Sequence, residues 1–384
     1  MTTVKVSRKG ANRVASGHPW IYSSDVLDRA NAQPGDVVTV ADERGRALGV
    51  AHFSSSSQIT LRFLTTRRET IDRGFYLRRL RQALEHRGRV VENSDADRLV
   101  FSEADLLPGL IVDRYGSYLV VQFLTQGMDR ARAEIMSCLE ELLKPAGILA
   151  RNDAAVRKLE ELPQSVDVLA GEIPEKVSVQ LNGLRLEADL IKGQKTGIYL
   201  DQRENYVAAA RYARGKVLDC FSSTGGFALH VAKQVESVDA VESSALAIES
   251  AKANAEANGI GNIEFRQADV FDYLSGREGR YSTIILDPPA FAKSRKQVDD
   301  AVRGYKDINT RALKMLEPGG VLVTCSCSHH ISEAMLAEIV AEAALDAGRT
   351  LRVLERRTQA ADHPILLTVP ETLYLKCLIL ETLA

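Results

Sequence analysis

The 384-residue sequence contains few cysteines, a single tryptophan and no long apolar run. Its five cysteines, Cys138, Cys220, Cys325, Cys327 and Cys377, are too few and too scattered for a disulfide framework, and they fit a reducing compartment. No apolar stretch approaches the roughly 18 residues that a membrane-spanning helix needs, and no apolar signal core follows the first residues. We therefore expect a cytoplasmic protein with no membrane partner.

Metal ligands are also sparse. Cys325 and Cys327 are close in sequence, but their C-x-C spacing has no second cysteine pair to complete a tetrahedral site, and His329 and His330 are merely adjacent. We therefore expect no metal. The composition, 45% hydrophobic and 26% charged, is typical of globular proteins, and the length suits two or three domains.

The net charge of −2, taken over the whole chain, gives no sign of a nucleic-acid partner, but the charge is unevenly distributed. Residues 1–89 carry 16 basic and 8 acidic side chains, a net charge of +8, whereas the remainder carries −10. Such an arginine-rich segment is either a solvated helix face or a surface that contacts phosphates. Most of the excess comes from Arg62, Arg67, Arg68, Arg73, Arg78, Arg79, Arg81, Arg87 and Arg89.

The first two predicted domains span residues 1–70 and 71–176. The first is a small β domain, because short apolar runs alternate with turns. Its expected strands are 36–40, 47–51 and 59–64. The second is a mixed α/β connecting domain, with a helix over 71–89 and a hairpin within 99–124 around the turn Asp113-Arg114-Tyr115-Gly116.

Residues 177–384 alternate regularly between strands and helices, which predicts an α/β domain with a doubly wound, parallel sheet of the Rossmann-like type. The expected strands are 217–219, 238–242, 263–269, 283–287 and 321–324, the last one after a turn over 317–320. The expected helices are 227–235, 245–257 and a long one that ends at 316.

Four of these strands end in a carboxylate. Ligands bind at the carboxyl ends of the strands in such a sheet, and an acid there is costly unless it is solvated or paired. One such acid alone is usually a helix N-cap, but four together indicate a binding site. They are Asp219, Glu242, Asp269 and Asp287.

The loop over residues 221–227 is glycine-rich, but it has neither the three spaced glycines of a dinucleotide fingerprint nor the lysine of a P-loop. It suits a nucleoside cofactor without phosphates, because glycines allow close approach and Glu242 can accept two hydrogen bonds from ribose hydroxyls. S-adenosylmethionine is such a cofactor, and Asp269 would then reach its adenine amino group.

Eight short motifs follow one another along nearly the whole chain. They are Gly17–Tyr22, Gly197–Asn205, Asp219–Phe227, Asp287–Pro289, Arg303–Asn309, Ser326–Ser328, Ala361–Pro364 and Tyr374–Lys376. Together they resemble the bacterial 23S ribosomal RNA cytosine-5 methyltransferase I family. This resemblance implies a class I methyltransferase domain, an N-terminal PUA domain that binds RNA, S-adenosylmethionine as methyl donor and 23S ribosomal RNA as partner.

The resemblance also implies a set of cofactor-binding residues. We expect these to be Gln202, Asp219, Phe221, Gly225, Glu242, Ser243, Asp269 and Val270. The target nucleotide and the oligomeric state, a homodimer included, stay open.

Two cysteines are candidates for covalent catalysis. Enzymes that methylate cytosine C5, a poor nucleophile, first add a thiolate to C6, so that one difficult step becomes two easier ones. Cys325 and Cys327 would face the same way in a continued strand, so periodicity cannot choose between them. The family's Ser-Cys-Ser pattern implies that Cys327 is the catalytic nucleophile and Cys325 a buried neighbour. For Cys138, Cys220 and Cys377 we expect core packing.

Asp287 is the second expected catalytic residue, because the resemblance implies that its carboxylate holds the N3–N4 edge of cytosine. Amino-group methyltransferases usually carry an aromatic directly after Pro-Pro, whereas here Ala290 precedes Phe291, which disfavours N-methylation. No second cysteine accompanies the prolines, so the group that removes the C5 proton stays open.

Basic residues just beyond these prolines are candidates for contact with RNA phosphates. They are Lys293, Arg295 and Lys296. The alternatives to cytosine-5 methylation are an exocyclic-amine or ring-nitrogen ribosomal RNA methyltransferase and a non-catalytic RNA-binding factor for ribosome assembly.

Overall fold

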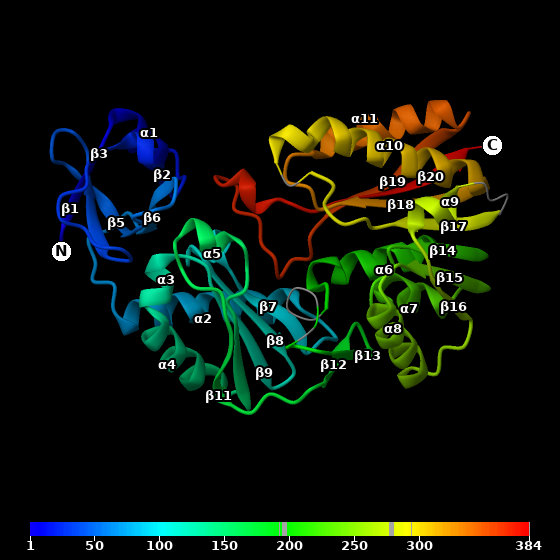
Figure 1. Cartoon of the computed structure of the whole chain (residues 1–384), viewed down its shortest axis with the longest axis horizontal. Coiled ribbons are helices and arrows are strands. Elements are labelled where there is room, and N and C mark those ends of the chain that lie inside the picture. The colour runs from blue at the N-terminus through cyan, green and yellow to red at the C-terminus, as the bar shows by residue number, and fades with distance from the viewer. Residues whose placement is uncertain (192, 194–197, 276–279, 293, 384) are drawn as a thin grey trace. The chain divides into compact units, whose positions relative to one another are not determined.

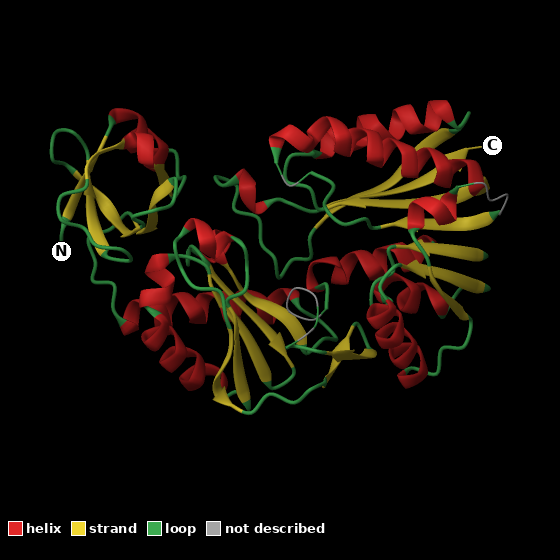
Figure 2. Ribbon diagram, viewed as in Figure 1, coloured by secondary structure: helices red, strands yellow, loops and turns green. Residues whose placement is uncertain are grey.

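The computed structural model describes residues 1–191, 193, 198–275, 280–292 and 294–383, which form two compact units (Figures 1 and 2). Unit 1 comprises Met1–Val179, Ala188–Ile198 and Ala361–Thr372. Unit 2 comprises Gln180–Glu187, Tyr199–Ala360 and Leu373–Ala384. Each unit is therefore assembled from segments that lie far apart in the sequence.

The N-terminal part of unit 1 is a six-stranded sheet of order β2-β6-β5-β4-β1-β3 with one α-helix. Its elements are β1 Thr3–Val6, α1 Arg8–Ala15, β2 Trp20–Tyr22, β3 Val26–Asp28, β4 Val37–Ala41, β5 Ala47–Phe53 and β6 Ile59–Thr65. The three strands expected in this part are present as β4, β5 and β6. The other three strands have three or four residues each and are too short to show a period, so they were not predicted. Helix α1, of eight residues, was not predicted either.

The second part of unit 1 is a five-stranded sheet of order β11-β10-β9-β8-β7. Its strands are β7 Ala96–Phe101, β8 Leu110–Tyr115, β9 Tyr118–Phe123, β10 Gly147–Arg151 and β11 Val166–Gly171, and its helices are α2 Arg73–Val90, α3 Gln126–Arg130, α4 Arg132–Leu143 and α5 Val156–Leu159. The expected helix is α2, capped by Asp72, whose side chain accepts from the Phe75 amide. The expected hairpin is β8–β9, but its turn is Gly116-Ser117, because Tyr115 pairs with Tyr118.

Two arginines of the basic segment are structural, which corrects their assignment to a phosphate-contacting surface. Arg87 is 2% exposed and holds both oxygens of Asp105, at 2.5 and 2.8 Å. Arg62 is buried too, and its Nη1 lies 2.8 Å from Glu160. A buried charge that loses its partner costs several kcal/mol, of the order of 3–5. The ion pairs of these two arginines therefore stabilise the folded protein. The amino-acid composition alone cannot distinguish such buried arginines from exposed ones.

The segment Ala361–Thr372 leaves unit 2 and completes unit 1. Asp362 is fully buried, accepts from the Arg98 amide at 3.0 Å and offers its carbonyl to Arg87 at 2.8 Å. Farther along, the Thr368 hydroxyl donates to the Gly17 carbonyl at 2.9 Å. The Ala361–Pro364 motif is thus a structural link inside unit 1.

Unit 2 contains a seven-stranded sheet of order β16-β15-β14-β17-β18-β20-β19, in which the first five strands are parallel and β20 is antiparallel to both neighbours. Its strands are β14 Lys216–Cys220, β15 Ser237–Glu242, β16 Ile263–Gln267, β17 Tyr281–Leu286, β18 Leu316–Ser326, β19 Thr350–Thr358 and β20 Lys376–Leu383. Its helices are α6 Arg203–Tyr212, α7 Gly226–Ala232, α8 Ala245–Ala257, α9 Val270–Leu274, α10 Val298–Met315 and α11 Glu333–Asp346. A hairpin of β12 Val177–Leu181 and β13 Leu184–Ala188 precedes this sheet.

Helices cover both faces of this sheet, as doubly wound folds require (Figure 1). Helices α9, α10 and α11 pack together on one face, and α6, α7 and α8 lie on the other. The predicted turn over 317–320 lies within β18, as an irregularity where the register with β17 jumps from Tyr281↔Leu316 to Thr283↔Val321. In the described part of the chain, no helix is both long and apolar enough to cross a membrane.

Two glycines of unit 1 provide a matched stability test. A Cβ on Gly127 would lie 2.1 Å from Cγ of His52, a buried ring whose pKa burial lowers to about 3. We expect Gly127→Ala to lower the free energy of unfolding by about 2 kcal/mol or more, because the ring must shift and its hydrogen bond with the Tyr76 hydroxyl, 3.2 Å long, is then strained or lost. Gly88 of α2 has nothing within 4 Å of its Cβ position, so Gly88→Ala should raise stability by about 0.5–1 kcal/mol. Urea unfolding measures both, and changes of the same sign would contradict this account.

Candidate active site at the carboxyl edge of the unit 2 sheet

The register of the parallel strands brings the predicted acids to one edge. Asp219 on β14 pairs with Ala240 on β15 and with Ile285 on β17. Glu242 is the last residue of β15, and Asp287 follows the last residue of β17. Because all these strands run in the same direction, the predicted gathering of carboxylates at the carboxyl edge is observed.

Asp219 is the most deeply buried of these acids. Its Oδ2 accepts from the Ala228 amide at 3.0 Å, but its Oδ1 has no hydrogen-bond partner among the described residues. Burial raises the pKa of Asp219 well above its usual range, and the nearby charges of Asp287 and Glu242 raise it further. A hydrogen-bond donor or cation brought by a ligand would relieve this cost.

The loop after β14 is shaped for close approach of a ligand. Phe221, Ser223 and Gly225 have positive φ angles of 63°, 49° and 89°. A Cβ on Gly226 would lie 2.4 Å from the Tyr206 ring, so only glycine fits there. The buried hydroxyl of Ser222 has no partner among the described residues, which adds a second unsatisfied polar atom at this loop.

The other predicted cofactor residues flank this loop. The Glu242 carboxylate accepts from the amides of Ser223, at 3.0 Å, and Ser244, at 2.9 Å, and lies 3.2 Å from the Ser243 hydroxyl. Asp269 is exposed and caps α9, because its Oδ1 accepts from the amides of the second and third helix residues. Val270, the first residue of α9, is buried. A contact of Asp269 with adenine stays a prediction.

Gln202 lies against the predicted base-holding acid. Its Nε2 donates to Asp287 Oδ1 at 2.9 Å, and its Oε1 accepts from Asn205 at 2.7 Å. Arg357 in turn donates to the Asn205 side-chain oxygen at 2.9 Å. The structure therefore gives Gln202 the role of orienting Asp287, and binding of the cofactor by Gln202 stays a prediction.

Among the five cysteines, all of which are described, Cys327 alone is partly exposed. Strand β18 ends at Ser326, so Cys325 and Cys327 do not share one strand face. Burial raises the pKa of the Cys325 thiol well above its ordinary value, and the facing Cys377 raises it further, so a thiolate there is unfavourable. Cys138, Cys220 and Cys377 are buried, as expected.

Two residues beside Cys327, Tyr305 and Lys376, lie in the motifs Arg303–Asn309 and Tyr374–Lys376, but no role was predicted for either from the sequence. The Tyr305 hydroxyl lies 2.9 Å from the Ser326 hydroxyl and 3.1 Å from that of Ser328. Lys376, 3% exposed, donates from Nζ to the Ser328 carbonyl at 2.7 Å. Burial lowers the pKa of Lys376 to about 8, although the negative charge of Cys327 raises it. Lys376 comes from antiparallel β20, 49 positions away in the chain, so only the tertiary fold reveals it.

An aromatic row runs from the glycine loop toward Cys327. The ring centroids of Phe221 and Phe271 are 6.5 Å apart, those of Phe271 and Phe291 6.0 Å, and those of Phe291 and Tyr305 4.6 Å. Phe291 is therefore packed between Phe271 and Tyr305. Of the predicted phosphate-contacting residues nearby, Arg295 and Lys296 are exposed and Lys293 lies outside the described residues. Within the described residues, no group of three His, Cys, Asp or Glu side chains could hold a metal ion.

The burial pattern predicts which thiol reacts. In the folded protein, iodoacetamide should alkylate Cys327 first, and the four buried cysteines should react only on unfolding. Below pH 8 the Lys376 ammonium favours the Cys327 thiolate, so Lys376→Met should slow this alkylation at pH 7 by about threefold to tenfold. Exposed Lys314→Met is the control and should leave the rate unchanged. Peptide mass spectrometry reads the sites, and earlier modification of Cys325 would contradict the assignment.

Two family models match this chain. Residues 4–66 match a PUA-like domain, and residues 107–379 match an S-adenosylmethionine-dependent methyltransferase family. Ribosomal RNA large subunit methyltransferase I of Tolumonas auensis is 42% identical over 399 residues that cover 100% of both chains. The protein of the same name from Aeromonas salmonicida is 43% identical over 95% of both chains.

Solved structures confirm the predicted fold class. A protein from Streptococcus mutans, assigned as a SAM-dependent methyltransferase, superposes with a TM-score of 0.84 at 20% identity, covering 99% of this chain and 100% of that one. A methyltransferase complexed with SAH gives a TM-score of 0.85 at 20% identity and the same coverage. The glycine loop, with its unsatisfied Asp219 and Ser222 oxygens, fits S-adenosylmethionine as cofactor. The chain therefore belongs to the S-adenosylmethionine-dependent methyltransferases, in the family of ribosomal RNA large subunit methyltransferase I.

Proposed function

We propose that this chain forms 5-methylcytidine in 23S ribosomal RNA, in the cytoplasm, through a covalent adduct between Cys327 and cytosine C6. The names of the relatives, which specify large-subunit ribosomal RNA, and the PUA-like domain support the RNA substrate. The observation that carries the covalent mechanism is the exposure of Cys327, alone among the cysteines, at the edge of the sheet that also bears Asp287.

The order of the strands supports the roles of both catalytic residues. Leu286 of β17 pairs with Thr324 of β18, so the residues that follow them, Asp287 and Cys325, continue side by side, and Cys327 comes two residues later. In the proposed site, the Asp287 carboxylate accepts from the cytosine amino group and from a protonated N3. Gln202, bonded to Oδ1 of Asp287, fixes the orientation of that carboxylate.

The proposed reaction balances as follows. The Cys327 thiolate donates its electron pair to C6, a bond forms between sulfur and carbon, and the electron density moves to C5. S-adenosylmethionine, which the loop after β14 would hold, would supply the methyl group that C5 takes, and breakage of its bond between sulfur and that methyl group would leave S-adenosylhomocysteine. A base then removes the C5 proton, and the electrons of that C–H bond restore the ring double bond and expel the thiolate from C6. The Lys376 ammonium beside Cys327 favours the thiolate at the start and at the end of this sequence.

The two neighbouring cysteines provide a paired test. We expect Cys327→Ala to reduce methyl transfer to 23S ribosomal RNA by at least about 1,000-fold, because the covalent route is lost. Cys325→Ala removes a buried thiol that forms no adduct, so activity should stay within a few-fold of wild type. Tritium transfer from labelled S-adenosylmethionine measures both variants, and calorimetry should show that both still bind the cofactor.

Nucleoside mass spectrometry of the product distinguishes the alternatives. The proposal requires 5-methylcytidine, together with a covalent complex between wild-type protein and RNA that contains 5-fluorocytidine. Full activity of Cys327→Ala with an N-methylated product would establish the amino- or ring-nitrogen alternative. Absence of any methylated nucleoside, with RNA binding retained, would establish a non-catalytic role.

A further inference from the structure

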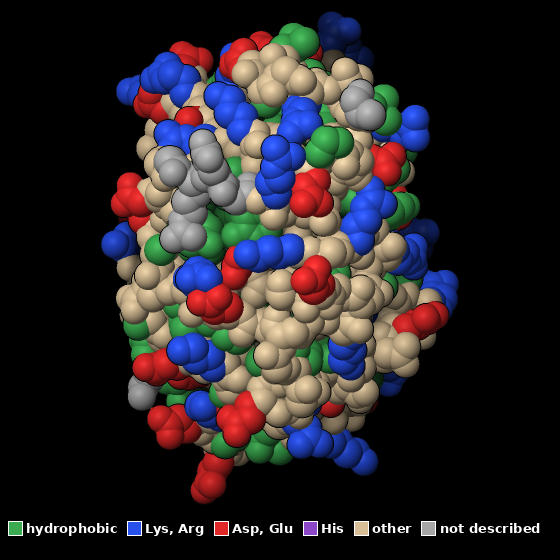
Figure 3. All heavy atoms as spheres, turned by 90° about the vertical axis from the view of Figure 1, so that its right-hand side faces the viewer, with side chains coloured by type: hydrophobic (Ala, Val, Ile, Leu, Met, Phe, Trp, Pro, Cys, Tyr) green, Lys and Arg blue, Asp and Glu red, His purple; other side chains and the backbone are tan. Residues whose placement is uncertain are grey.

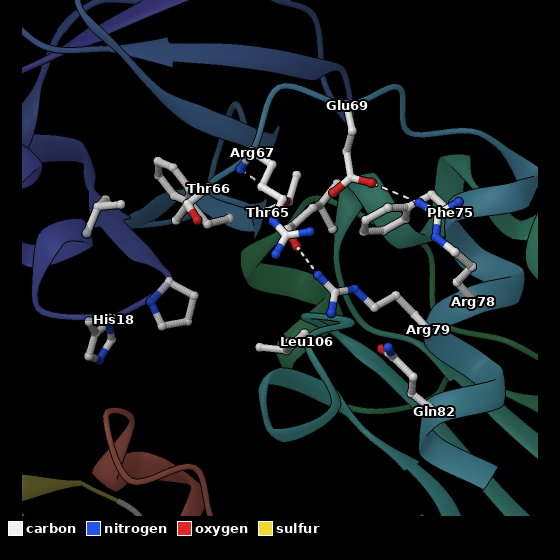
Figure 4. Close-up of a pocket in the computed structure, with 15 residues that line it drawn as sticks. His18, Thr65, Thr66, Arg67, Glu69, Phe75, Arg78, Arg79, Gln82 and Leu106 are labelled. Carbon is white, nitrogen blue, oxygen red and sulfur yellow. Dashed lines mark hydrogen bonds and ion pairs between the residues drawn. The ribbon is translucent and has the colours of Figure 1, made fainter. Parts of the chain in front are cut away.

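Unit 1 contains a cavity of about 410 Å³ that neither the fold nor the methyl-transfer chemistry explains (Figure 4). Four segments line it: the chain after α1, the end of β6 with the residues that follow, the exposed side of α2, and the turn at Leu106. Arg78, Arg79 and Gln82 project into it from α2, and Arg67 and Glu69 come from the segment after β6 (Figure 4).

The cavity has an excess of positive charge. The guanidinium groups of Arg67, Arg78 and Arg79 line it. Glu69 is the single carboxylate among the lining residues, and it pairs with Arg78 at 2.8 Å. Arg79 is half-buried, and its Nη2 donates to the Leu64 carbonyl at 3.2 Å. Burial lowers the pKa of Arg79 most, the Glu69 carboxylate raises it in part, and the positive charges of Arg78 and Arg67 lower it again. An anion in the cavity would offset this repulsion.

One face of the molecule does not share this excess of positive charge. On the face drawn in Figure 3, Lys and Arg side chains are interspersed with Asp and Glu side chains. Within the basic segment, Arg73 and Arg81 both pair with Glu141 on α4, and Arg62 and Arg87 are buried. Of the other five arginines of this segment, Arg67, Arg78 and Arg79 line the cavity, and Arg68 and Arg89 are exposed outside its lining.

Apolar side chains also line the cavity. Pro19 and Leu106 line it, and the Leu106 side chain is 39% exposed. Leu106 also has a left-handed backbone, with φ 56° and ψ 33°, which costs roughly 1–2 kcal/mol for a residue with a Cβ. Such strain persists where the surrounding structure enforces it and clusters at ligand sites. The fold therefore holds an exposed apolar side chain beside Arg79 in this cavity (Figure 4).

We propose that this cavity binds one nucleotide of the RNA substrate, with its phosphate on Arg67 and Arg79 and its base or sugar against Leu106 and Pro19. Guanidinium groups match phosphate geometry, and apolar side chains provide a surface for an unpaired base. The volume suits one nucleotide and excludes a duplex. This inference rests on the proposed RNA substrate, and it assigns to unit 1 a recognition site separate from the Asp287–Cys327 edge.

The test measures RNA affinity, which does not depend on methyl transfer. The probe is a fluorescent single-stranded RNA of about ten nucleotides from a large-subunit RNA loop, bound to the full-length protein and followed by anisotropy. We expect Arg67→Gln and Arg79→Gln each to weaken binding roughly tenfold and to reduce the slope of log K against log salt by about 0.7. Arg81→Gln, the same charge change on the same helix but outside the cavity, is the control.

A second variant separates a nucleotide from a free anion. Leu106→Gly removes the apolar contact and relieves the backbone strain, so the protein should stay at least as stable while its RNA affinity falls several-fold. Binding of inorganic phosphate, measured in parallel by calorimetry, should be unchanged in Leu106→Gly and lost in Arg79→Gln. Thermal unfolding of every variant shows whether Arg79→Gln, at a half-buried position, still folds. Because Arg67 is exposed, Arg67→Gln should fold normally, and it tests RNA binding even if Arg79→Gln does not fold.

Two results would overturn the proposal. RNA affinity equal to that of wild type in Arg67→Gln and Leu106→Gly would show that the cavity does not contact RNA. Phosphate binding with no effect of any variant on RNA would show an anion site of another kind. Loss of 5-methylcytidine formation alone would leave the RNA result standing, so failure of the proposed chemistry and failure of this site are distinguishable.

Discussion

The parallel register of β17 between β14 and β18 is the constraint on which the chemistry of unit 2 depends. Cys220, Leu286 and Thr324 lie side by side in neighbouring strands, and Leu378 of β20 continues the same row. The residues that follow Cys220, Leu286 and Thr324, and those that precede Leu378 in antiparallel β20, must emerge at one edge of the sheet. The cofactor loop, Asp287 and Cys327 are therefore brought together by strand alignment, and loop geometry only adjusts their final positions.

Buried ionisable groups at this edge of the sheet, Asp219 and Lys376, lower the stability of the folded protein. Burial raises the pKa of Asp219 and lowers that of Lys376, so the charged form of each is disfavoured in the folded protein. The folded protein retains the Asp219 proton more strongly than the unfolded chain does, so stability falls as pH rises through the interval between the two Asp219 pKa values. For Lys376 the unfolded chain binds more protons between about pH 8 and the ordinary lysine pKa, so stability rises with pH there. Both groups are costly to the fold, which is typical of residues retained for binding and catalysis.

The sequence predicts those elements that a short local pattern of residues determines. Strands β14, β15 and β17 follow from short apolar runs, and the convergence of Asp219, Glu242 and Asp287 follows from their parallel direction. S-adenosylmethionine and the fold class were predicted correctly, from the loop chemistry and from the family resemblance. The separate roles of Cys325 and Cys327 were implied by the resemblance alone, and their different burial supports them.

The sequence does not predict features that depend on burial or on distant segments. Arg62 and Arg87 count as surface charges until the fold shows their buried partners. Lys376 lies beside Cys327 because β20 inserts antiparallel between β18 and β19, an arrangement that no periodicity reveals. Asp269 was predicted to end a strand, but β16 ends at Gln267 and the Asp269 oxygen caps α9. A strand-end acid and a helix N-cap look the same in a sequence.

The interleaved order of the segments also has a consequence for biosynthesis. Unit 1 needs Asp362 to complete the hydrogen bonds of Arg87 and Arg98, and the sheet of unit 2 needs β20 between β18 and β19. A nascent chain emerges from the ribosome with its N-terminus first, so the hydrogen bonds of unit 1 wait for Asp362 and the sheet of unit 2 waits for β20 to be translated. The basic segment of unit 1 thus leaves the exit tunnel before its buried arginines have all their partners.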